Sequence, residues 1–275
     1  MSGRPQLRRV LLAAVGALLL VAAPASASLR AVAVTQSVPL AVTKTVKATC
    51  PTGQHVAFGG WRTSSTVSDY TPPQAIAPVG KRVAGWSVVA KGNTPPAAKV
   101  TSLAYCAPGP KPTVVRLTGD LQTGTLEVQQ LAVVCPAGMK VLGGGFRATT
   151  LVYPVDLERQ EPLEAWRVRV VNANGGAGKL TAIALCGRGP RPAAVEATTK
   201  VAEGAAGSVT ATCPAGTTAP FGGLRTTWDT ATPITSLPTA MARPKDRSIR
   251  VSAIHAPTGP DLTSKADVVA IAYCR

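Results

Sequence analysis

Residues 135–147, CPAGMKVLGGGFR, belong to a pattern that occurs three times in this chain. The other copies are residues 50–62, CPTGQHVAFGGWR, and residues 213–225, CPAGTTAPFGGLR. In every copy, eleven positions separate the cysteine from the apolar residue that follows the paired glycines. A second cysteine ends an apolar run further along each copy, at Cys106, Cys186 and Cys274. Because the same spacing occurs in all three copies, the pattern indicates one structural unit that is repeated along the chain.

The repeated unit is predicted to consist of about four β-strands. Residues 45–50 alternate between polar and apolar side chains, which is the period of a strand with one buried face. The Cys-Pro-x-Gly turn leads into a second strand, whose glycine pair indicates a bulge or a neighbouring backbone too close for a Cβ. Residues 166–170 form the third strand, after a long loop such as residues 63–83 in the first copy. Residues 268–274 are apolar on both faces, so the fourth strand is expected to be central in its sheet.

Three sets of four strands predict an all-β body with approximate threefold symmetry. A β-prism of three sheets fits this count, and a β-trefoil and tandem small β-sandwiches are the alternatives. The expected repeats are residues 28–118, 119–197 and 198–275, which together build one domain. Proline-rich links join the copies, because Cys106-Ala-Pro-Gly-Pro-Lys-Pro in the first link is similar to Cys186-Gly-Arg-Gly-Pro-Arg-Pro in the second.

The N-terminus has the features of a secretory signal peptide, predicted to be residues 1–27. Three arginines precede an uncharged apolar run at residues 10–23, and Ala25-Ser26-Ala27 forms a small-residue cleavage site. That run is short for a membrane-spanning helix, which needs roughly 20 apolar residues, and no later stretch is apolar enough to span a bilayer. We therefore expect a secreted, extracellular protein without a transmembrane segment in the mature chain.

Six cysteines in an exported chain predict three disulfides. One pair in each copy would join Cys50 to Cys106, Cys135 to Cys186 and Cys213 to Cys274. The rival pairing between copies would join Cys106 to Cys135, Cys186 to Cys213 and Cys274 to Cys50. We favour pairing within copies, because each unit is then braced by itself. No Cys-x-x-Cys occurs and no histidine accompanies the cysteines, so no metal site is expected.

Four residues are candidates for binding a ligand. Arg62, Arg147 and Arg225 occupy the same place in the three copies, and a guanidinium suits carboxylate or phosphate groups. The simpler and favoured interpretation is an outward strand residue whose stem covers an apolar neighbour. Trp228 has no counterpart in the other copies and is the candidate exposed aromatic residue. The remaining tryptophans are expected in the core, at Trp61, Trp86 and Trp166.

The second copy carries four acidic residues in its expected long loop, at Asp156, Glu158, Glu161 and Glu164. Paired carboxylates could serve glycoside hydrolysis or hold calcium, but a solvated, self-paired surface is the favoured interpretation. The chain has no Gly-x-Ser-x-Gly, no glycine-rich phosphate loop and no His-Glu-x-x-His. We therefore expect no enzyme activity, no catalytic residues and no cofactor.

The charge of the chain is strongly basic and unevenly distributed. The formal net charge is +16, and removal of the three signal-peptide arginines leaves +13. Residues 28–118 hold ten basic residues and one acid, whereas residues 119–197 hold eight and seven. The basic residues are dispersed, so a solvated basic surface is favoured over a specific nucleic-acid site. An anionic cell-wall polymer or a glycan is the expected partner.

The second copy, with Cys-Pro-Ala-Gly, Gly-Gly-Gly-Phe, Trp-x-Val and Ala-x-Cys, resembles a repeat of uncharacterised secreted proteins of actinobacteria. The layout in three sets is similar, by analogy, to vitelline membrane outer layer proteins, and this likeness implies a β-prism. Neither family supplies catalytic residues for this sequence. We expect a secreted, non-catalytic structural or binding protein of the cell envelope or extracellular space. The alternatives are a secreted glycan hydrolase and a secreted protease inhibitor that presents the loop of residues 63–83.

Overall fold

The protein is described here by a computed structural model. The structure describes residues 29–64, 70–80, 83–92, 97–124, 127–226, 236–256 and 265–275. These residues form eighteen β-strands and contain no helix. The all-β class predicted from the sequence is therefore confirmed. The expected signal peptide, residues 1–27, and Trp228 lie outside the described residues.

The eighteen strands fall into three sets of six. Set 1 contains β1 (Arg30–Val38), β2 (Thr43–Thr49), β3 (His55–Thr63), β4 (Pro73–Val79), β5 (Gly85–Lys91) and β6 (Ala98–Ala107). Set 2 contains β7 (Thr113–Leu121), β8 (Val128–Val134), β9 (Lys140–Ala148), β10 (Val152–Gln160), β11 (Ala165–Asn172) and β12 (Gly178–Gly187). Set 3 contains β13 (Ala193–Ala202), β14 (Ala206–Thr212), β15 (Phe221–Thr226), β16 (Ser236–Lys245), β17 (Ser248–His255) and β18 (Lys265–Cys274). The repeat limits expected at 118/119 and 197/198 fall inside β7 and β13.

The prediction of about four strands per repeat is wrong, because each repeat forms six. The four expected strands are present, and in set 1 they are β2, β3, β5 and β6. The additional strands are the first and fourth of each set. The fourth strand lies in the segment expected to be a long loop, since residues 63–83 contain β4. This strand was not predicted because proline within a run argues against a strand. In the structure the strand register shifts directly after Pro73, Pro154 and Pro238, and a bulge is a position where a strand tolerates proline.

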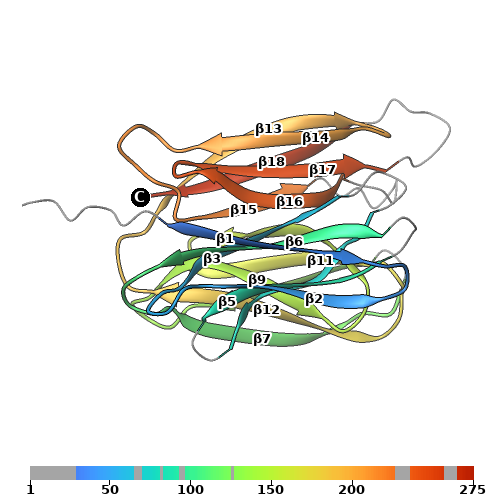
Figure 1. Ribbon diagram of the computed structural model, residues 1–275, viewed down its shortest axis with the longest axis horizontal. Coiled ribbons are helices and arrows are strands. Elements are labelled where there is room, and N and C mark those ends of the chain that lie inside the picture. Colours follow the sequence, from blue (N-terminus) through green and yellow to red (C-terminus); the bar gives the residue numbers. More distant parts are fainter. Residues whose placement is uncertain are drawn as a thin grey trace, which may run out of the picture.

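Each six-stranded sheet is shared between two sets. Sheet I has the order β1-β6-β3-β16-β17-β14, sheet II has β2-β5-β4-β9-β12-β7, and sheet III has β13-β18-β15-β10-β11-β8. Set 1 thus contributes to sheets I and II, set 2 to II and III, and set 3 to III and I. The sets form a closed cycle, and most of their strands run roughly along the long direction of the molecule (Figure 1). The expected central position of the last strand is confirmed, because β6, β12 and β18 each lie between two neighbours.

Each sheet is closed by one short joint between strands of different sets. At these joints β3 pairs with β16, β9 with β4, and β15 with β10. Each joint has two residue pairs, of which one is apolar and points into the core. The apolar pairs are Trp61 with Met241, Phe146 with Ile76, and Leu224 with Leu157, and all six side chains are fully buried.

The paired glycines are required by two close approaches. A Cβ on the first glycine of the pair would collide with the core residue of the same set: Gly59 with Trp86, Gly144 with Trp166, and Gly222 with Ile249. A Cβ on the second glycine would collide with a backbone carbonyl of the preceding set in the cycle. At Gly60 it would lie 2.1 Å from the Met241 oxygen, and at Gly145 it would lie 1.9 Å from the Ile76 oxygen. The predicted close approach of a neighbouring backbone is confirmed.

The disulfides join residues within each set, as favoured from the sequence. They connect Cys50 to Cys106, Cys135 to Cys186, and Cys213 to Cys274, and no cysteine is free. The rival pairing between copies is wrong. The first cysteine of each pair follows a strand of one sheet and the second lies in a strand of another, so each bond holds two sheets together. Three disulfides indicate an extracellular or otherwise oxidising environment.

The glycine that faces a carbonyl at a joint is predicted to be irreplaceable. Gly145→Ala forces a Cβ against the Ile76 carbonyl, and this overpacking against backbone should lower the free energy of unfolding by about 3 kcal/mol or more. Thermal unfolding with the disulfides intact measures the effect. Gly176→Ala is the control, because nothing lies within 4 Å of its added Cβ. Equal stability of the two variants would contradict the explanation.

Removal of one disulfide is predicted to destabilise the protein without changing its fold. The Cys213→Ala/Cys274→Ala double variant opens a bond with a sequence separation of 61, which corresponds to about 4 kcal/mol in the chain-entropy model. Guanidinium unfolding measures this difference. The Cys135→Ala/Cys186→Ala variant should cost nearly the same, because the dependence on loop length is logarithmic. A loss confined to one of the two variants would refute the repeated role of these bonds.

Candidate functional site

The three repeated arginines occupy equivalent places at the joints, but they lie on three different sheets. Arg62 pairs with Ala240 in sheet I, Arg147 with Ala75 in sheet II, and Arg225 with Asp156 in sheet III. Each follows the buried apolar residue of its joint, so its side chain points to the outer face. The arginines therefore do not converge on one site, and each must be considered with its own neighbours.

In sheet III, Arg225 is neutralised by two acidic side chains. Its Nη2 lies 2.6 Å from Glu196 Oε1, and its Nε lies 3.4 Å from Glu158 Oε2. Glu158 also pairs with Arg167 on the neighbouring strand. The outer face of this joint is consequently occupied by ion pairs within the protein.

A buried carboxylate extends this charge network. Asp156 is completely buried, and its Oδ2 lies 2.7 Å from Arg169 Nη1 and 3.6 Å from Arg167 Nη2. Burial lowers the pKa of Arg167, and the charge of Asp156 opposes this effect. The expectation that Asp156 and Glu158 lie in a solvated loop is wrong. Both belong to β10, and the strand pairing places them opposite arginines of β11.

The other two acidic residues of this copy lie at the turn between β10 and β11. Glu161 pairs with Arg159 and with Arg191, the latter at 3.4 Å. Glu164 Oε1 lies 2.8 Å from Arg191 Nε and 3.8 Å from Lys140 Nζ. The pairing of these acids with basic residues agrees with the expected self-paired surface. None of the grooves described below is lined by an acid of this group.

The corresponding positions of sheet II carry no acid. The pairing registers align Ala75 with Asp156 and Ala77 with Glu158. They also align Arg116 with Glu196, because both lie on the edge strand opposite the apolar residue of the central strand. The residue that neighbours the repeated arginine on the edge strand is therefore a glutamate in sheet III and a second arginine in sheet II.

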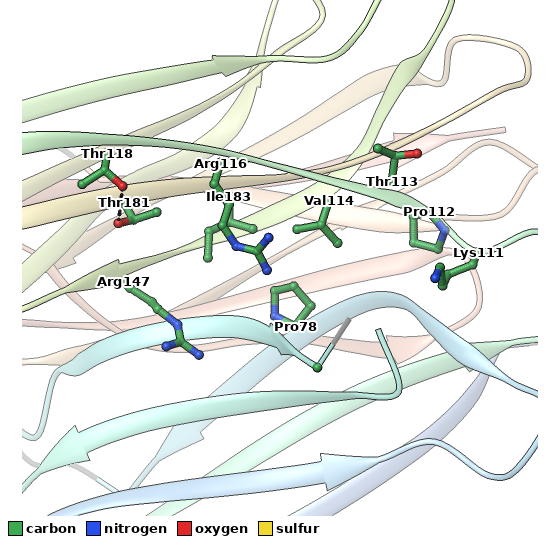
Figure 2. Close-up of a pocket in the computed structure, with 11 residues that line it drawn as sticks. Pro78, Lys111, Pro112, Thr113, Val114, Arg116, Thr118, Arg147, Thr181 and Ile183 are labelled. Carbon is green, nitrogen blue, oxygen red and sulfur yellow. Dashed lines mark hydrogen bonds between the residues drawn. The ribbon is translucent and has the colours of Figure 1, made fainter. Parts of the chain in front are cut away.

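Arg116 and Arg147 line a groove of about 790 Å³ on the outer face of sheet II. Ile183 and Thr181 of β12 lie between the two strands that carry these arginines, and Pro78 borders the groove (Figure 2). Lys111 is a third basic residue of the lining, which includes no acid. Neither arginine has an ion-pair partner among the described residues. The groove is therefore a positively charged surface.

The arginines of sheet II also have a packing role. Ile183 lies on the outer face and is nevertheless only 1% exposed, so the neighbouring side chains cover it. Covering of an apolar neighbour by the stem of a long basic side chain is the simpler role expected from the sequence. Covering Ile183 still leaves the guanidinium groups in the groove, so the two roles are compatible.

Sheet I has a smaller version of this groove. Arg62 and Arg250 line a hollow of about 340 Å³, in which Ala240 and Ala242 take the places of the two acids of β10. Arg250 Nε donates a hydrogen bond to Thr210 Oγ1 at 3.3 Å. Arg62 has no ion-pair partner among the described residues. Two of the three sheets therefore present unneutralised arginines on their outer faces.

Sequence reasoning identified Arg147 but missed Arg116, its neighbour in the groove. The signal was present, because an alignment that includes the first strand of each repeat places Arg116 beside Ala33 and Glu196. The four-strand repeat did not include that strand. Trp228, the remaining candidate, lies outside the described residues.

No family model matches the sequence, and no curated protein matches it either. Within the described residues, no group of three histidine, cysteine, aspartate or glutamate side chains is placed to hold a metal ion. The same residues include no helix with the length and apolarity to cross a bilayer.

The buried acid of sheet III is predicted to matter far more for stability than the exposed one. Asp156→Asn leaves Arg167 and Arg169 short of a carboxylate, and breaking such a buried pair should cost about 3 kcal/mol. Glu196→Gln should cost less than about 1 kcal/mol, because its side chain is 48% exposed and its ion pair is screened. Urea unfolding of both variants tests this contrast. Similar losses of stability in the two variants would contradict the explanation that burial makes the Asp156 ion pairs the more important ones.

Proposed function

We propose that the protein is a secreted, non-catalytic binding protein of the cell envelope or extracellular space, and that it holds an anionic polymer against sheet II. The observation that carries this proposal is the pair Arg116 and Arg147, which stands where sheet III has an arginine and a glutamate. A second arginine in place of the acid leaves the charge of Arg147 unneutralised. An anionic ligand would supply the missing negative charge.

The chemistry of the groove favours carboxylate or phosphate groups. Guanidinium groups bind both anions with paired N–H donors. The groove is an open feature on the surface of a sheet, and sheet I presents a second arginine pair at Arg62 and Arg250. Repeated cationic positions on separate faces suit a polymer with regularly spaced anionic groups. Anionic cell-wall polymers and acidic glycans belong to this class.

We also propose that the three sheets form a β-prism with approximate threefold symmetry, built as one domain from three repeats. The cyclic sharing of sheets supports this arrangement, because every set contributes three strands to each of two sheets. Equivalent glycines and equivalent apolar pairs at the three joints support it further. In a prism the outer faces of the sheets are the largest surfaces, and this is where the arginines lie.

Replacement of Arg116 by glutamate is predicted to abolish binding at sheet II. Arg116→Glu gives sheet II the arginine–glutamate pair that sheet III already has, so it should keep the melting temperature and weaken polymer binding at least tenfold. Binding of the mature protein to wall teichoic acid and to polygalacturonate at low salt measures this change, and neutral dextran shows the background.

The control for this experiment is Lys265→Glu, which changes the net charge equally but lies on β18 of sheet III. It should retain most of the binding. An equal loss in both variants would show that overall charge, rather than the groove, attracts the polymer. If the protein is retained on neither of the two anionic polymers at low salt, the proposed function is refuted.

A further inference from the structure

A separate pocket of about 310 Å³ lies at one end of the molecule. Its walls come from the start of β3 and β9 and from the ends of β6 and β18, near the Cys-Pro-x-Gly turns. The link between β6 and β7 also contributes, through Pro108, Pro110 and Pro112. None of the repeated arginines lines this pocket.

The same position of all three repeats lines the pocket. Ala57, Leu142 and Pro220 each stand seven positions after the first cysteine of their copy, and all three belong to the lining. A cavity bordered by one equivalent residue from every member of a closed cycle of three lies on the axis of that cycle. Next to it in sequence, Gly143 stands where the other copies have Phe58 and Phe221, and both phenylalanines lie close to this glycine.

The walls of this axial pocket are largely apolar. Leu29, Ala107 and the three link prolines join the residues of the repeated position. Leu142, Ala57 and Pro220 are half-buried, so their side chains border both the core and the pocket. An apolar lining of this kind favours a ligand with an apolar body.

The charged groups that line the pocket are predominantly basic. Asp246 is occupied by Arg243, whose Nη1 lies 2.9 Å from its Oδ1, while Arg243 Nε donates to the Ala219 carbonyl oxygen at 2.8 Å. Burial lowers the pKa of His55, which favours its neutral imidazole. Arg188 and Arg275 remain, and neither has an ion-pair partner among the described residues.

Arg275 is held at the pocket by its backbone. Its N–H donates to the Thr218 carbonyl oxygen at 2.9 Å and its main-chain oxygen accepts from the Thr218 N–H at 2.9 Å. Thr218 itself lines the pocket. This two-way pairing fixes the backbone from which the guanidinium extends, so only the side chain must be ordered when a ligand binds.

We propose that the axial pocket binds a small organic anion, in which an apolar ring or short acyl chain fills the pocket and one carboxylate or sulfonate pairs with Arg188 and Arg275. The occupant is a small molecule, because the cavity lies at the lower end of the volumes of ligand pockets, about 300–1,000 Å³. It differs from the polymer proposed for sheet II in size and in its apolar body. The two sites share Pro112 but no arginine.

The probe for this pocket is 2-naphthoate, and 2-naphthalenemethanol serves as its neutral analogue. Isothermal titration of the disulfide-intact mature protein should show saturable binding with one site, and naphthoate should bind at least tenfold more tightly than the alcohol. Arg188→Gln/Arg275→Gln should remove that difference. Leu142→Trp should abolish binding of both compounds by filling the pocket.

Arg116→Glu is the matched control and should leave naphthoate binding unchanged, so failure at this pocket is distinguishable from failure at sheet II. Where Leu142→Trp does not show a cooperative thermal transition, Ala57→Leu fills the same space with a smaller side chain. Unchanged naphthoate affinity in the folded filling variant would overturn the proposal. Equal affinity for naphthoate and its alcohol would also overturn it, and so would the absence of saturable binding.

Discussion

The close approach of two backbones at each joint is the constraint on which this structure depends. A sheet that passes from one set to another has only two residue pairs at the crossing, and a Cβ on Gly60 or Gly145 would stand about 2 Å from a carbonyl oxygen of the other set. The adjacent glycine, Gly59 or Gly144, makes room for a core tryptophan of its own set. The glycine pair thus fixes both the packing inside a repeat and the contact to the neighbouring repeat. Because the sets form a cycle, all three joints must form for the cycle to be closed.

Within this shared framework, the repeats differ by matched substitutions. The hydroxyl of Tyr105 accepts a hydrogen bond from the Arg243 N–H at 2.6 Å, and that of Tyr273 accepts one from the Arg159 N–H at 2.8 Å. At the third joint, Leu185 has no hydroxyl and Pro78 has no N–H, so neither partner is left unsatisfied. Burial raises the pKa of Tyr273 to about 12, which keeps its hydroxyl neutral over the physiological range. The charges on the outer faces follow a similar logic: the arginine at the joint of sheet III is neutralised within the protein, whereas Arg116 and Arg147 of sheet II have no ion-pair partner among the described residues.

The sequence was sufficient for those features that depend on local period and spacing. The alternation before Cys50, the apolar run that ends at Cys274 and the glycine pairs all predicted what the structure shows. The fourth strand of each set escaped prediction, because Pro73 and its counterparts interrupt the pattern and only the bulge beside them makes the strand possible. The role of Arg116 depends on which residue lies across the sheet, and a register between distant strands cannot be derived from local pattern. The burial of Asp156 depends in the same way on arginines brought opposite it by strand pairing.

The sharing of every sheet has a consequence for how a single set would behave. A single set cut from this protein would carry two unfinished half-sheets, one ending at the strand with the glycine pair and the other at the proline-bearing strand. These two edges are complementary, since they are the surfaces that meet at every joint. A fragment with two different complementary edges associates head to tail, and such association closes into a ring when the rotation between neighbours permits. In the present chain the proline-rich links join the three sets, so these complementary edges meet within one polypeptide.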